Sequence, residues 1–425
     1  MRIAFTLTWK KLAAAGVGAV VLALAVSLSG LVSIAASSGH YGVVGWFLHW
    51  TMQNSVDRQS MLISVPEGID LADPALVQRT AGHFASGCAS CHGAPGVPQS
   101  PVVLSMTPHP PRLEENVGEW EDRELFWIVK HGIKYSGMPS WVTQDRDDEV
   151  WAQVAFLRAL PDMTAERYAE LALGGTPANS PAGPGGETAA GSAGVFETAL
   201  ADCSRCHGRD GLGRGSGDAA GAFPVIAGQP KAYLLATLKA FSAGDRQSGL
   251  MQPPAKRYDD ATLAKLADWY ASQPAADPDP DPTARMSDAA TGGSAAPRDG
   301  IPAQILPKGA RSEGAIVTSA AAGNLPPDRG ALLDLGRRIA MEGIAARKIP
   351  SCESCHGAEG RRKNDLYPVL DGQPEWYAKT HLELWKEGHR GGTRFAHLMA
   401  KIAPNMTDEQ IDAVAAWYAE QPLGH

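Results

Sequence analysis

The chain has 425 residues, of which 20% are charged and 44% hydrophobic, and its formal net charge is −8 at pH 7. This length predicts two to four domains. No run of basic residues is present, so the composition does not favour a nucleic-acid-binding protein.

The chain begins with a segment that is typical of export or membrane anchoring. Lys10 and Lys11 precede a run from Leu12 to Ala36 that contains no charged residue. As a helix, this run would span about 37 Å, which is enough to cross a bilayer with some tilt. The positive-inside rule then predicts a cytoplasmic N-terminus and an exported remainder. We expect 1–57 to form an anchor helix and interfacial segment of a single-pass protein in the bacterial inner membrane.

A cleavable signal peptide is the alternative for this segment. Its apolar core usually has about 7–15 residues, fewer than the charge-free run, although Ser33-Ile34-Ala35 would serve as a cleavage site. Aromatic residues beyond the run favour a retained anchor, because such side chains gather at membrane–water interfaces. They are Tyr41, Trp46, Phe47 and Trp50. Packing in the core of the first domain is their alternative role.

Three copies of the pattern Cys-x-x-Cys-His account for all six cysteines. Their residues are Cys88, Cys91 and His92, then Cys203, Cys206 and His207, and finally Cys352, Cys355 and His356. This pattern is the attachment sequence of c-type haem, in which the two thiols form thioether bonds and the histidine binds the iron. We therefore predict three covalently bound haem c groups. Because bacteria attach such haem on the outer side of the cytoplasmic membrane, we expect the haem domains in the periplasm.

Other uses of paired cysteines have to be compared with haem attachment. A redox dithiol or a zinc site can also be built from Cys-x-x-Cys, and an exported chain can form disulfides. Zinc usually requires two such pairs in one site, whereas the three pairs here are far apart in the sequence. Neither a dithiol nor a disulfide requires the His-Gly dipeptide that follows each pair. Haem attachment explains the whole pattern.

Two stretches without hydrophobic periodicity divide the rest of the chain into three haem domains. Both are rich in small residues and proline, as linkers are. The predicted order is domain 1 at 58–173, a linker at 174–192, domain 2 at 193–275, a linker at 276–326 and domain 3 at 327–425. Domains of this size bury little apolar surface alone, so a central haem would supply much of each core.

Each domain is expected to pair a helix before the haem motif with a second helix that closes the domain. Asp73-Pro74 predicts a helix start in domain 1, and Thr407 with Gln410 predicts a capping box in domain 3. The closing helices begin near Glu149, Asp260 and Thr407, and their apolar positions have helical spacing. We expect each closing helix to lie against the first helix of its domain.

Domains 2 and 3 are more similar to each other than either is to domain 1. Residues 223–230 align with 367–374, and both segments end in Gly-Gln-Pro. Tyr233 then matches Tyr377. Domain 1 has a different sequence at the comparable place, 108–113. We interpret domain 1 as a unit added to a closely related pair.

The second axial ligand of each iron decides whether the site is closed or can bind small molecules. Between His207 and Met286 the chain contains no other histidine and one methionine, Met251. Met251 is therefore the candidate ligand in domain 2, and the repeat makes Met138 and Met399 the corresponding candidates in domains 1 and 3. In chain order, the three methionines follow their motif histidines by 46, 44 and 43 residues. Such similar intervals predict one loop geometry used three times.

Nearby histidines offer alternative ligands: His131 in domain 1, and His389 or His397 in domain 3. Met406 is a weaker candidate in domain 3, because it lies beside the cap of the closing helix. Plain core packing is the alternative role of any of the methionines. A Met/His pair would give a higher haem potential than two histidines.

The second ring nitrogen of an iron-binding histidine is often held by a backbone carbonyl. Pro224 and Pro368 lie in the repeated segments of domains 2 and 3 and are candidates to supply that carbonyl. An ordinary role as turn prolines is the alternative.

These residues resemble those of class I c-type cytochromes. Residues from about 190 to 425 are similar to tandem dihaem cytochromes of bacterial periplasms in their haem motifs, Gly-Gln-Pro segments and aromatic closing helices. Residues from about 30 to 172 are similar to a membrane-anchored monohaem cytochrome. The resemblance implies an all-α protein with three class I cytochrome c domains after one N-terminal transmembrane helix. It also implies His/Met-ligated haems and electron carriage.

Formal charge is unevenly distributed along the chain. Residues 58–175 carry a net charge of −7, whereas 190–276 carry +1 and 326–425 carry −1. An acidic domain 1 would attract a basic partner by electrostatic steering. A solvated acidic surface without a partner is an equal alternative.

The sequence therefore predicts a membrane-anchored triheme electron carrier in the periplasm, with no catalytic residues. It would act between a dehydrogenase or quinol-oxidising complex and a terminal acceptor such as an oxidase, so its partners would be periplasmic or membrane redox proteins. One alternative is a haem peroxidase or gas-binding protein, which requires an open iron site. Another is a cytochrome subunit of a membrane-bound dehydrogenase complex.

Overall fold

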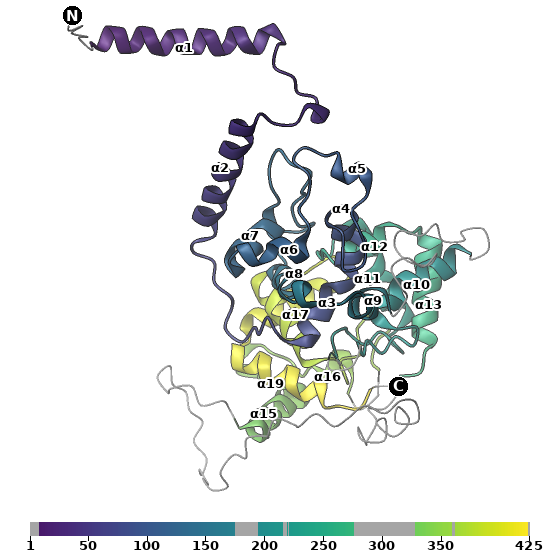
Figure 1. Ribbon diagram of the computed structural model, residues 1–425. Helices are drawn as coiled ribbons and strands as arrows, with labels where there is room; N and C mark the ends of the chain where they lie inside the picture. Colours follow the sequence, from purple (N-terminus) through teal and green to yellow (C-terminus); the bar gives the residue numbers. More distant parts are fainter. Residues whose placement is uncertain are drawn as a thin grey trace, which may run out of the picture. The chain divides into compact units, whose positions relative to one another are not determined.

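The computed structural model describes residues 8–174, 194–215, 219, 221–275, 328–358 and 362–423. Within these ranges the regular elements are helices, joined by loops and two isolated β-bridges, which confirms the all-α prediction (Figure 1). The chain divides into two compact units, Met1–Ala189 and Ala190–His425. The predicted linkers at 174–192 and 276–326 lie outside the described residues, apart from Gly174.

Unit 1 contains the predicted anchor and domain 1 (Figure 1). Its longer helices are α1 (Trp9–Ser29), α2 (Gly42–Ser60), α3 (Pro74–His83), α7 (Asp122–His131), α8 (Asp147–Ala159) and α9 (Ala165–Leu173). Its shorter helical elements are η1 (Ala36–Ser38), η2 (Phe84–Cys88), α4 (Ala89–His92), α5 (Pro101–Leu104), α6 (Leu113–Asn116), η3 (Val117–Glu119) and η4 (Leu160–Asp162).

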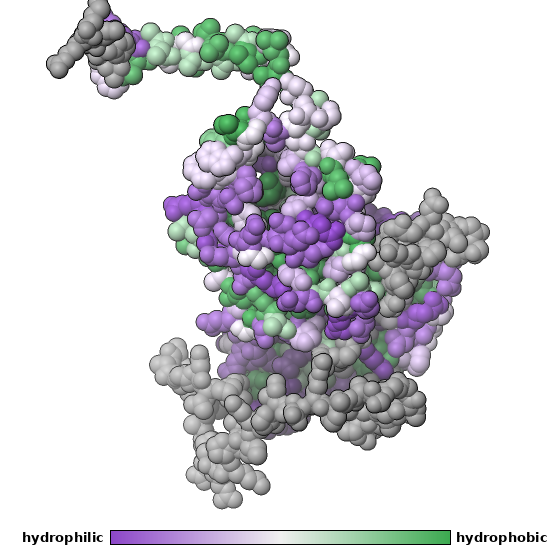
Figure 2. Space-filling view, viewed as in Figure 1, coloured by the Kyte–Doolittle hydropathy of each residue, from purple (hydrophilic) through white to green (hydrophobic). Residues whose placement is uncertain are grey.

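Among the helices that the structure describes, α1 is the one long and apolar enough to cross a membrane. The Thr8 side chain caps its start by accepting a hydrogen bond from the Lys11 amide, and Gly30 ends it in the left-handed conformation. Its 21 residues span about 31 Å, close to the hydrocarbon thickness of a bilayer. The helix is therefore shorter than the charge-free run, which continues to Ala36. Figure 2 shows that the surface of α1 is largely hydrophobic, and none of its residues is buried.

Domain 1 is built on the packing of α8 and α9 against α3. Asp73 caps α3 by accepting a hydrogen bond from the Ala75 amide (2.9 Å), and Pro74 is the first helical residue, as predicted. After His83 the backbone widens into the π-helix η2, which leads into the first haem motif. Neither η2 nor α9, which buries Tyr168, follows from the sequence patterns described above.

Unit 2 contains domains 2 and 3. The helices of domain 2 are α10 (Val195–His207), α11 (Lys231–Ala243), α12 (Gln252–Lys256) and α13 (Asp260–Ser272). Those of domain 3 are α15 (Arg329–Glu342), η6 (Ala345–Arg347), α16 (Glu353–His356), α17 (Glu375–Glu387), α18 (Ala396–Ile402), η7 (Ala403–Asn405) and α19 (Asp408–Ala419). The closing helices α13 and α19 pack on α10 and α15, as expected. The capping box of Thr407 and Gln410 is also confirmed.

The crossing of α15 and α19 is close because Gly336 has no side chain. A Cβ atom at this position would lie 2.7 Å from the Cβ of Trp417 and still closer to the carbonyl oxygen of Ala413. Both neighbours belong to α19, and Ala413 is fully buried. The two helices therefore approach each other only with glycine at position 336.

Replacing Gly336 with alanine is expected to destabilise domain 3 by about 1–3 kcal/mol, because the helices must move apart. Gly330→Ala is a matched control on the same helix, since its added Cβ would come no closer than 3.6 Å to Asp328. Denaturant unfolding of the haem-loaded chain measures both variants. Equal stability of the two variants would contradict this account of the crossing.

The Gly-Gln-Pro segment of each domain in unit 2 is hydrogen-bonded to the closing helix of the same domain. Gly228 and Gly372 have φ angles of 65° and 71°, a region that favours glycine. Their amides donate hydrogen bonds to the carbonyls of Tyr270 (3.0 Å) and Tyr418 (2.9 Å) on the closing helices. The proline of each segment immediately precedes α11 or α17.

The glutamines of the same segments join domain 2 to domain 3. The amide group of Gln373 donates to the Val225 carbonyl (2.7 Å) and accepts from the Val225 amide (3.1 Å). Gln229 forms the same pair of bonds with Val369 (2.9 and 3.0 Å). All four residues are buried. The two domains are thus joined by a reciprocal set of four hydrogen bonds, in which each repeat provides the same residues.

Candidate haem-binding sites

Each haem motif forms a turn of helix that ends in glycine. The motif is the end of α10 in domain 2, whereas α4 and α16 carry it in domains 1 and 3. Helical spacing of three residues places the two cysteines of a pair on the same side of the turn. Gly93, Gly208 and Gly357 follow the histidines with φ angles of 72°, 77° and 77°. The His-Gly dipeptide therefore turns the chain immediately after the histidine.

All three motif histidines have the same hydrogen bond to a proline carbonyl. The distances from Nδ1 to the carbonyl oxygen are 2.8 Å for His92 and Pro111, 3.3 Å for His207 and Pro224, and 3.0 Å for His356 and Pro368. When Nδ1–H donates this bond, Nε2 has a free lone pair for a metal. The bond also fixes the orientation of the ring.

The prediction for Pro224 and Pro368 is confirmed, and Pro111 is a third residue of the same kind. In domain 1 the segment comparable to the repeated segments is 108–113, for which the sequence alone predicts no such carbonyl. The available signal was the Pro110-Pro111 pair at the equivalent place. Gln99 fixes this segment to the haem motif, because its side-chain amide donates to the carbonyls of Cys91 (2.9 Å) and Pro110 (2.7 Å).

The cysteine thiols fit haem attachment better than metal or dithiol chemistry. All six are free and half-buried. Burial raises the pKa of Cys88, Cys203 and Cys352 to about 12, and that of Cys206 to about 11. A redox dithiol or a zinc site needs thiolates stabilised by their surroundings, and the surroundings of these four cysteines favour the protonated thiol instead. Within the described residues, no group of three or more His, Cys, Asp and Glu side chains could hold a metal ion.

The three predicted methionine ligands are all half-buried, but their backbone settings differ. Met138 lies in the loop between α7 and α8, Met251 is the N-cap of α12, and Met399 lies within α18. The prediction of one shared loop geometry is therefore wrong. Proline explains the difference, because Pro139 disfavours helix at the preceding residue and α12 has proline in its first turn. α18 contains no proline, so the helix continues through Met399.

The residues that could replace these methionines as ligands lie in different surroundings. His131, His389 and His397 are exposed. Met406 is only 3% exposed and packs in the core of domain 3 with Ile411 and other apolar residues.

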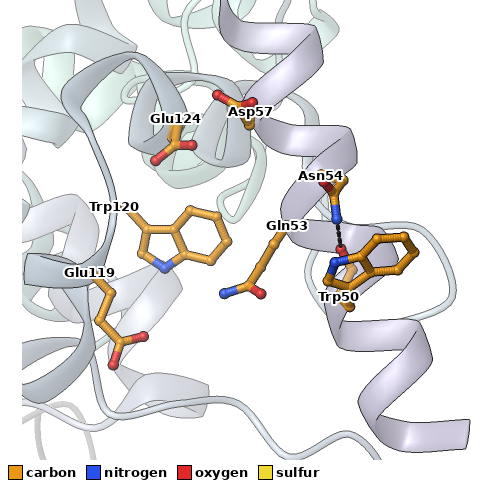
Figure 3. Close-up of a pocket in the computed structure, with 7 residues that line it drawn as sticks. All are labelled: Trp50, Gln53, Asn54, Asp57, Glu119, Trp120 and Glu124. Atoms are coloured by element: carbon orange, nitrogen blue, oxygen red, sulfur yellow. Dashed lines mark hydrogen bonds between the residues drawn. The ribbon is translucent and has the colours of Figure 1, made fainter.

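Unit 1 also has an open cleft of about 330 Å³ between α2 and the segment from η3 to α7. Figure 3 shows its lining residues, which are Trp50, Gln53, Asn54, Asp57, Glu119, Trp120 and Glu124. Arg123 pairs with Asp57 (2.7 Å), and Glu124 accepts a hydrogen bond from the Glu121 amide (2.8 Å). None of the haem-motif residues lines this cleft, so it is separate from the first haem site.

Two parts of the chain match known cytochrome families. The family described as cytochrome c oxidase, cbb3-type, subunit III, matches residues 75–157, and the family described as cytochrome c matches residues 335–420. These ranges contain the first and third haem motifs.

Individual relatives include an electron acceptor of thiosulfate dehydrogenase and a cytochrome c4. A thiosulfate dehydrogenase electron acceptor of Thiomonas intermedia is 30% identical over 224 residues, which are 52% of this chain and 80% of the relative. A cytochrome c4 of Azotobacter vinelandii is 26% identical over 239 residues, 54% of this chain and 89% of the relative. Among solved structures, a thiosulfate dehydrogenase from Marichromatium purpuratum is 27% identical with a TM-score of 0.35, over 52% of this chain and 36% of that one.

The helical fold, the haem motifs, the two family matches and the two relatives similar in sequence together define a c-type cytochrome. The chain belongs to the class I c-type cytochromes and is a multi-haem member with covalently bound haem c. Haem c supplies one-electron exchange when bound. The paired thiols would attach the group, and the proline carbonyls orient the histidine rings that would bind its iron. Its biochemical role is electron transfer.

Proposed function

We propose that this chain is a membrane-anchored carrier with three haem c groups, one in each of the domains 58–173, 193–275 and 327–425. The observation that carries the proposal is the threefold repetition of one arrangement. A cysteine pair lies on a helical turn, and the adjacent histidine donates from Nδ1 to a proline carbonyl. A single such turn can arise by chance, but three with the same second contact point to three equivalent haem sites.

We further propose Met138, Met251 and Met399 as the second axial ligands. Their half-buried side chains suit a residue that contacts a buried group, whereas the competing histidines are exposed and Met406 belongs to a packed core. Three closed irons would favour electron exchange over the binding of small molecules. This ligation separates the carrier from a peroxidase or gas-binding protein.

Substituting each methionine in turn tests the ligands. Met138→Ala, Met251→Ala and Met399→Ala should each convert about one third of the haem to a high-spin form that binds carbon monoxide. Each should also lower one of the three midpoint potentials, because the thioether sulfur favours reduced iron. Electron paramagnetic resonance and redox titration measure both effects.

Met406→Leu is the matched control for Met399→Ala, since it changes a core methionine of the same domain without a large change in volume. It should leave all three haems low-spin. A Met399→Ala protein with unchanged spin state and potentials would exclude Met399 as a ligand. Carbon monoxide binding by the unsubstituted protein would instead favour the open-site alternative.

Retention of α1 as an anchor is part of the same proposal. The helix has the length and apolar character that a membrane span requires. The aromatic residues that follow, Tyr41, Trp46, Phe47 and Trp50, are all at least half exposed, so they do not pack in the core of domain 1. Exposed aromatic side chains directly after an apolar helix suit the membrane–water interface. The haem domains would then lie in the periplasm.

For the electron donor we propose a periplasmic dehydrogenase, with a thiosulfate-oxidising enzyme as the first to test. A relative at 30% identity has the name of a thiosulfate dehydrogenase electron acceptor. The match of 75–157 to a cytochrome oxidase subunit family suggests an oxidase as the acceptor of domain 1. The same relatives favour a second candidate function, which is a cytochrome subunit bound permanently to its dehydrogenase.

Gentle detergent purification distinguishes a free carrier from a subunit. A stoichiometric enzyme that remains bound through size-exclusion chromatography would favour the subunit. A free chain that is reduced by added dehydrogenase and thiosulfate would favour the carrier. If reduction occurs with quinol and not with thiosulfate, the proposed donor is wrong.

A further inference from the structure

The two walls of the cleft in unit 1 are fixed by arginine side chains. On the wall formed by α2, Arg123 of α7 donates to the Asp57 carbonyl (2.9 Å), the Ser60 hydroxyl (2.9 Å) and the Asp57 carboxylate (2.7 Å). On the opposite wall, Arg158 of α8 donates to the Trp120 carbonyl (2.6 Å). The cleft is therefore formed by the fold itself, and a ligand would not have to order its walls.

Several polar groups in the cleft are available to a ligand. Figure 3 shows the side chains of Gln53 and Trp120 pointing toward each other from the two walls. Among the described residues, the Gln53 amide and the Trp120 indole N–H have no hydrogen-bond partner, and Glu119 has no ion-pair partner. Glu124 accepts from the Glu121 amide (2.8 Å) through one oxygen, which leaves its second oxygen available. The cleft thus offers hydrogen-bond donors beside two carboxylates.

The charge and the aromatic rings of the cleft favour a positively charged ligand. Its lining includes three carboxylates and, within the part of the chain that the structure describes, no cationic side chain. Arg123 compensates only part of this negative charge, because it also pairs with Glu121 outside the lining (2.7 Å). The faces of the indole rings of Trp50 and Trp120 also attract cations. A cation in the cleft would be stabilised by carboxylates and aromatic rings together.

The position of the cleft on α2 relates it to the membrane surface. Trp46, Phe47 and Trp50 in the first half of α2 are at least half exposed, whereas the exposed residues of α2 from Gln53 onward are polar. Gln53 lies about 5 Å beyond Trp50 along the helix, and the headgroup layer of a bilayer is about 5–8 Å deep. With the aromatic residues at the membrane–water interface, the cleft therefore lies at the level of the lipid headgroups.

We propose that this cleft binds the phosphoethanolamine headgroup of an aminophospholipid. A primary ammonium has three hydrogen-bond donors, which the carboxylates of Glu119 and Glu124 accept, while Gln53 and the Trp120 indole N–H donate to the phosphate oxygens. A lipid bound here attaches α2 to the membrane surface at a second point beyond α1, and so orients domain 1 relative to the bilayer. This inference rests on the proposed retention of α1, which brings the cleft to the membrane.

Native mass spectrometry of the full haem-loaded chain in detergent tests the site. Added phosphatidylethanolamine should bind at one saturable position. Phosphatidylglycerol with the same acyl chains should bind about tenfold more weakly, because it has no ammonium group to bond to the carboxylates, and these repel its phosphate. Equal binding of the two lipids would overturn the inference.

Two variants of the full chain assign the binding to the cleft. Glu119→Gln removes one exposed carboxylate and should weaken phosphatidylethanolamine binding about tenfold; its control is Glu67→Gln, at an exposed position of unit 1 that does not line the cleft. Trp120→Leu should weaken binding about fivefold, and Trp127→Leu, on α7 but outside the lining, is its control. Affinity that is unchanged in Glu119→Gln, whose exposed side chain makes no contact that the fold needs, would exclude the cleft as the site.

A basic partner protein is the other source of an ammonium group. Displacement of the lipid by O-phosphoethanolamine, and not by a lysine-rich peptide at the same ionic strength, supports the headgroup site. Displacement by the peptide alone would identify a protein-binding site and overturn the assignment to lipid.

The same spectra separate this inference from the proposed anchor, because they give the mass of the chain. A chain that begins after α1 would reject the anchor and, with it, the inference. A chain that retains α1 but does not distinguish the two lipids would reject the headgroup site alone.

Discussion

Removing both cysteines of the second motif is expected to leave a protein with two haems instead of three and with an unfolded domain 2. Cys203 packs against a core that includes Leu200, Leu263 and Tyr270. A domain of this size buries too little apolar surface to be stable when its centre is empty. Cys203→Ser with Cys206→Ser prevents both thioether bonds, so haem would no longer be retained there.

Intact mass and hydrogen exchange measure this result. The mass should fall by one haem beyond the change in the two side chains, and amides of α10 and α13 should lose protection. Ser204→Ala is the control, because Ser204 lies between the two cysteines and its hydroxyl donates to the nearby Ala201 carbonyl (3.1 Å), away from the thiols. A double variant that retains three haems, or retains full protection in α10 and α13, would contradict the account of domain 2.

Replacing Gln373 with leucine should break the connection between domains 2 and 3. Gln373 is 4% exposed and satisfies both backbone groups of Val225, which is itself buried. Leucine satisfies neither group. Each unsatisfied buried group costs about 1–3 kcal/mol, so the interface should lose about 2–6 kcal/mol. Gln229→Leu should act in the same way on Val369.

Hydrogen exchange at single residues tests this connection. In Gln373→Leu, the Val225 amide should exchange much faster, because the domains separate to let water solvate it. Gln273→Leu is the control, since Gln273 makes its bond within α13, to the Trp269 carbonyl (3.0 Å). Unchanged exchange at Val225 in Gln373→Leu would show that the glutamine does not hold the interface.

Features that depend on local sequence were predictable. The caps at Asp73 and Thr407, the pairing of first and closing helices, and the carbonyls of Pro224 and Pro368 all follow from neighbouring residues or from a motif repeated in the chain. These signals act over a few residues, or appear twice in the sequence, so the pattern alone reveals them.

Features that depend on tertiary contacts could not be predicted from the sequence. The Gly-Gln-Pro repeat was visible, but nothing local indicates that its glutamine bonds to a valine 148 residues away. The backbone around each methionine depends on where proline falls, so equal spacing did not produce equal geometry. Arg246 belongs to no motif, and its burial beside Tyr377 depends on the packing of domain 2 against domain 3.

In the proposed function, the chain holds three haem c groups, and each iron has an axial ligand from the protein on both faces of the haem. Coulometric reduction of the purified full-length protein, followed by electron paramagnetic resonance, tests it most directly. The account predicts that each chain accepts three electrons and that the oxidised protein shows low-spin signals only. Fewer than three electrons per chain, or a high-spin signal from most of the haem, would contradict it.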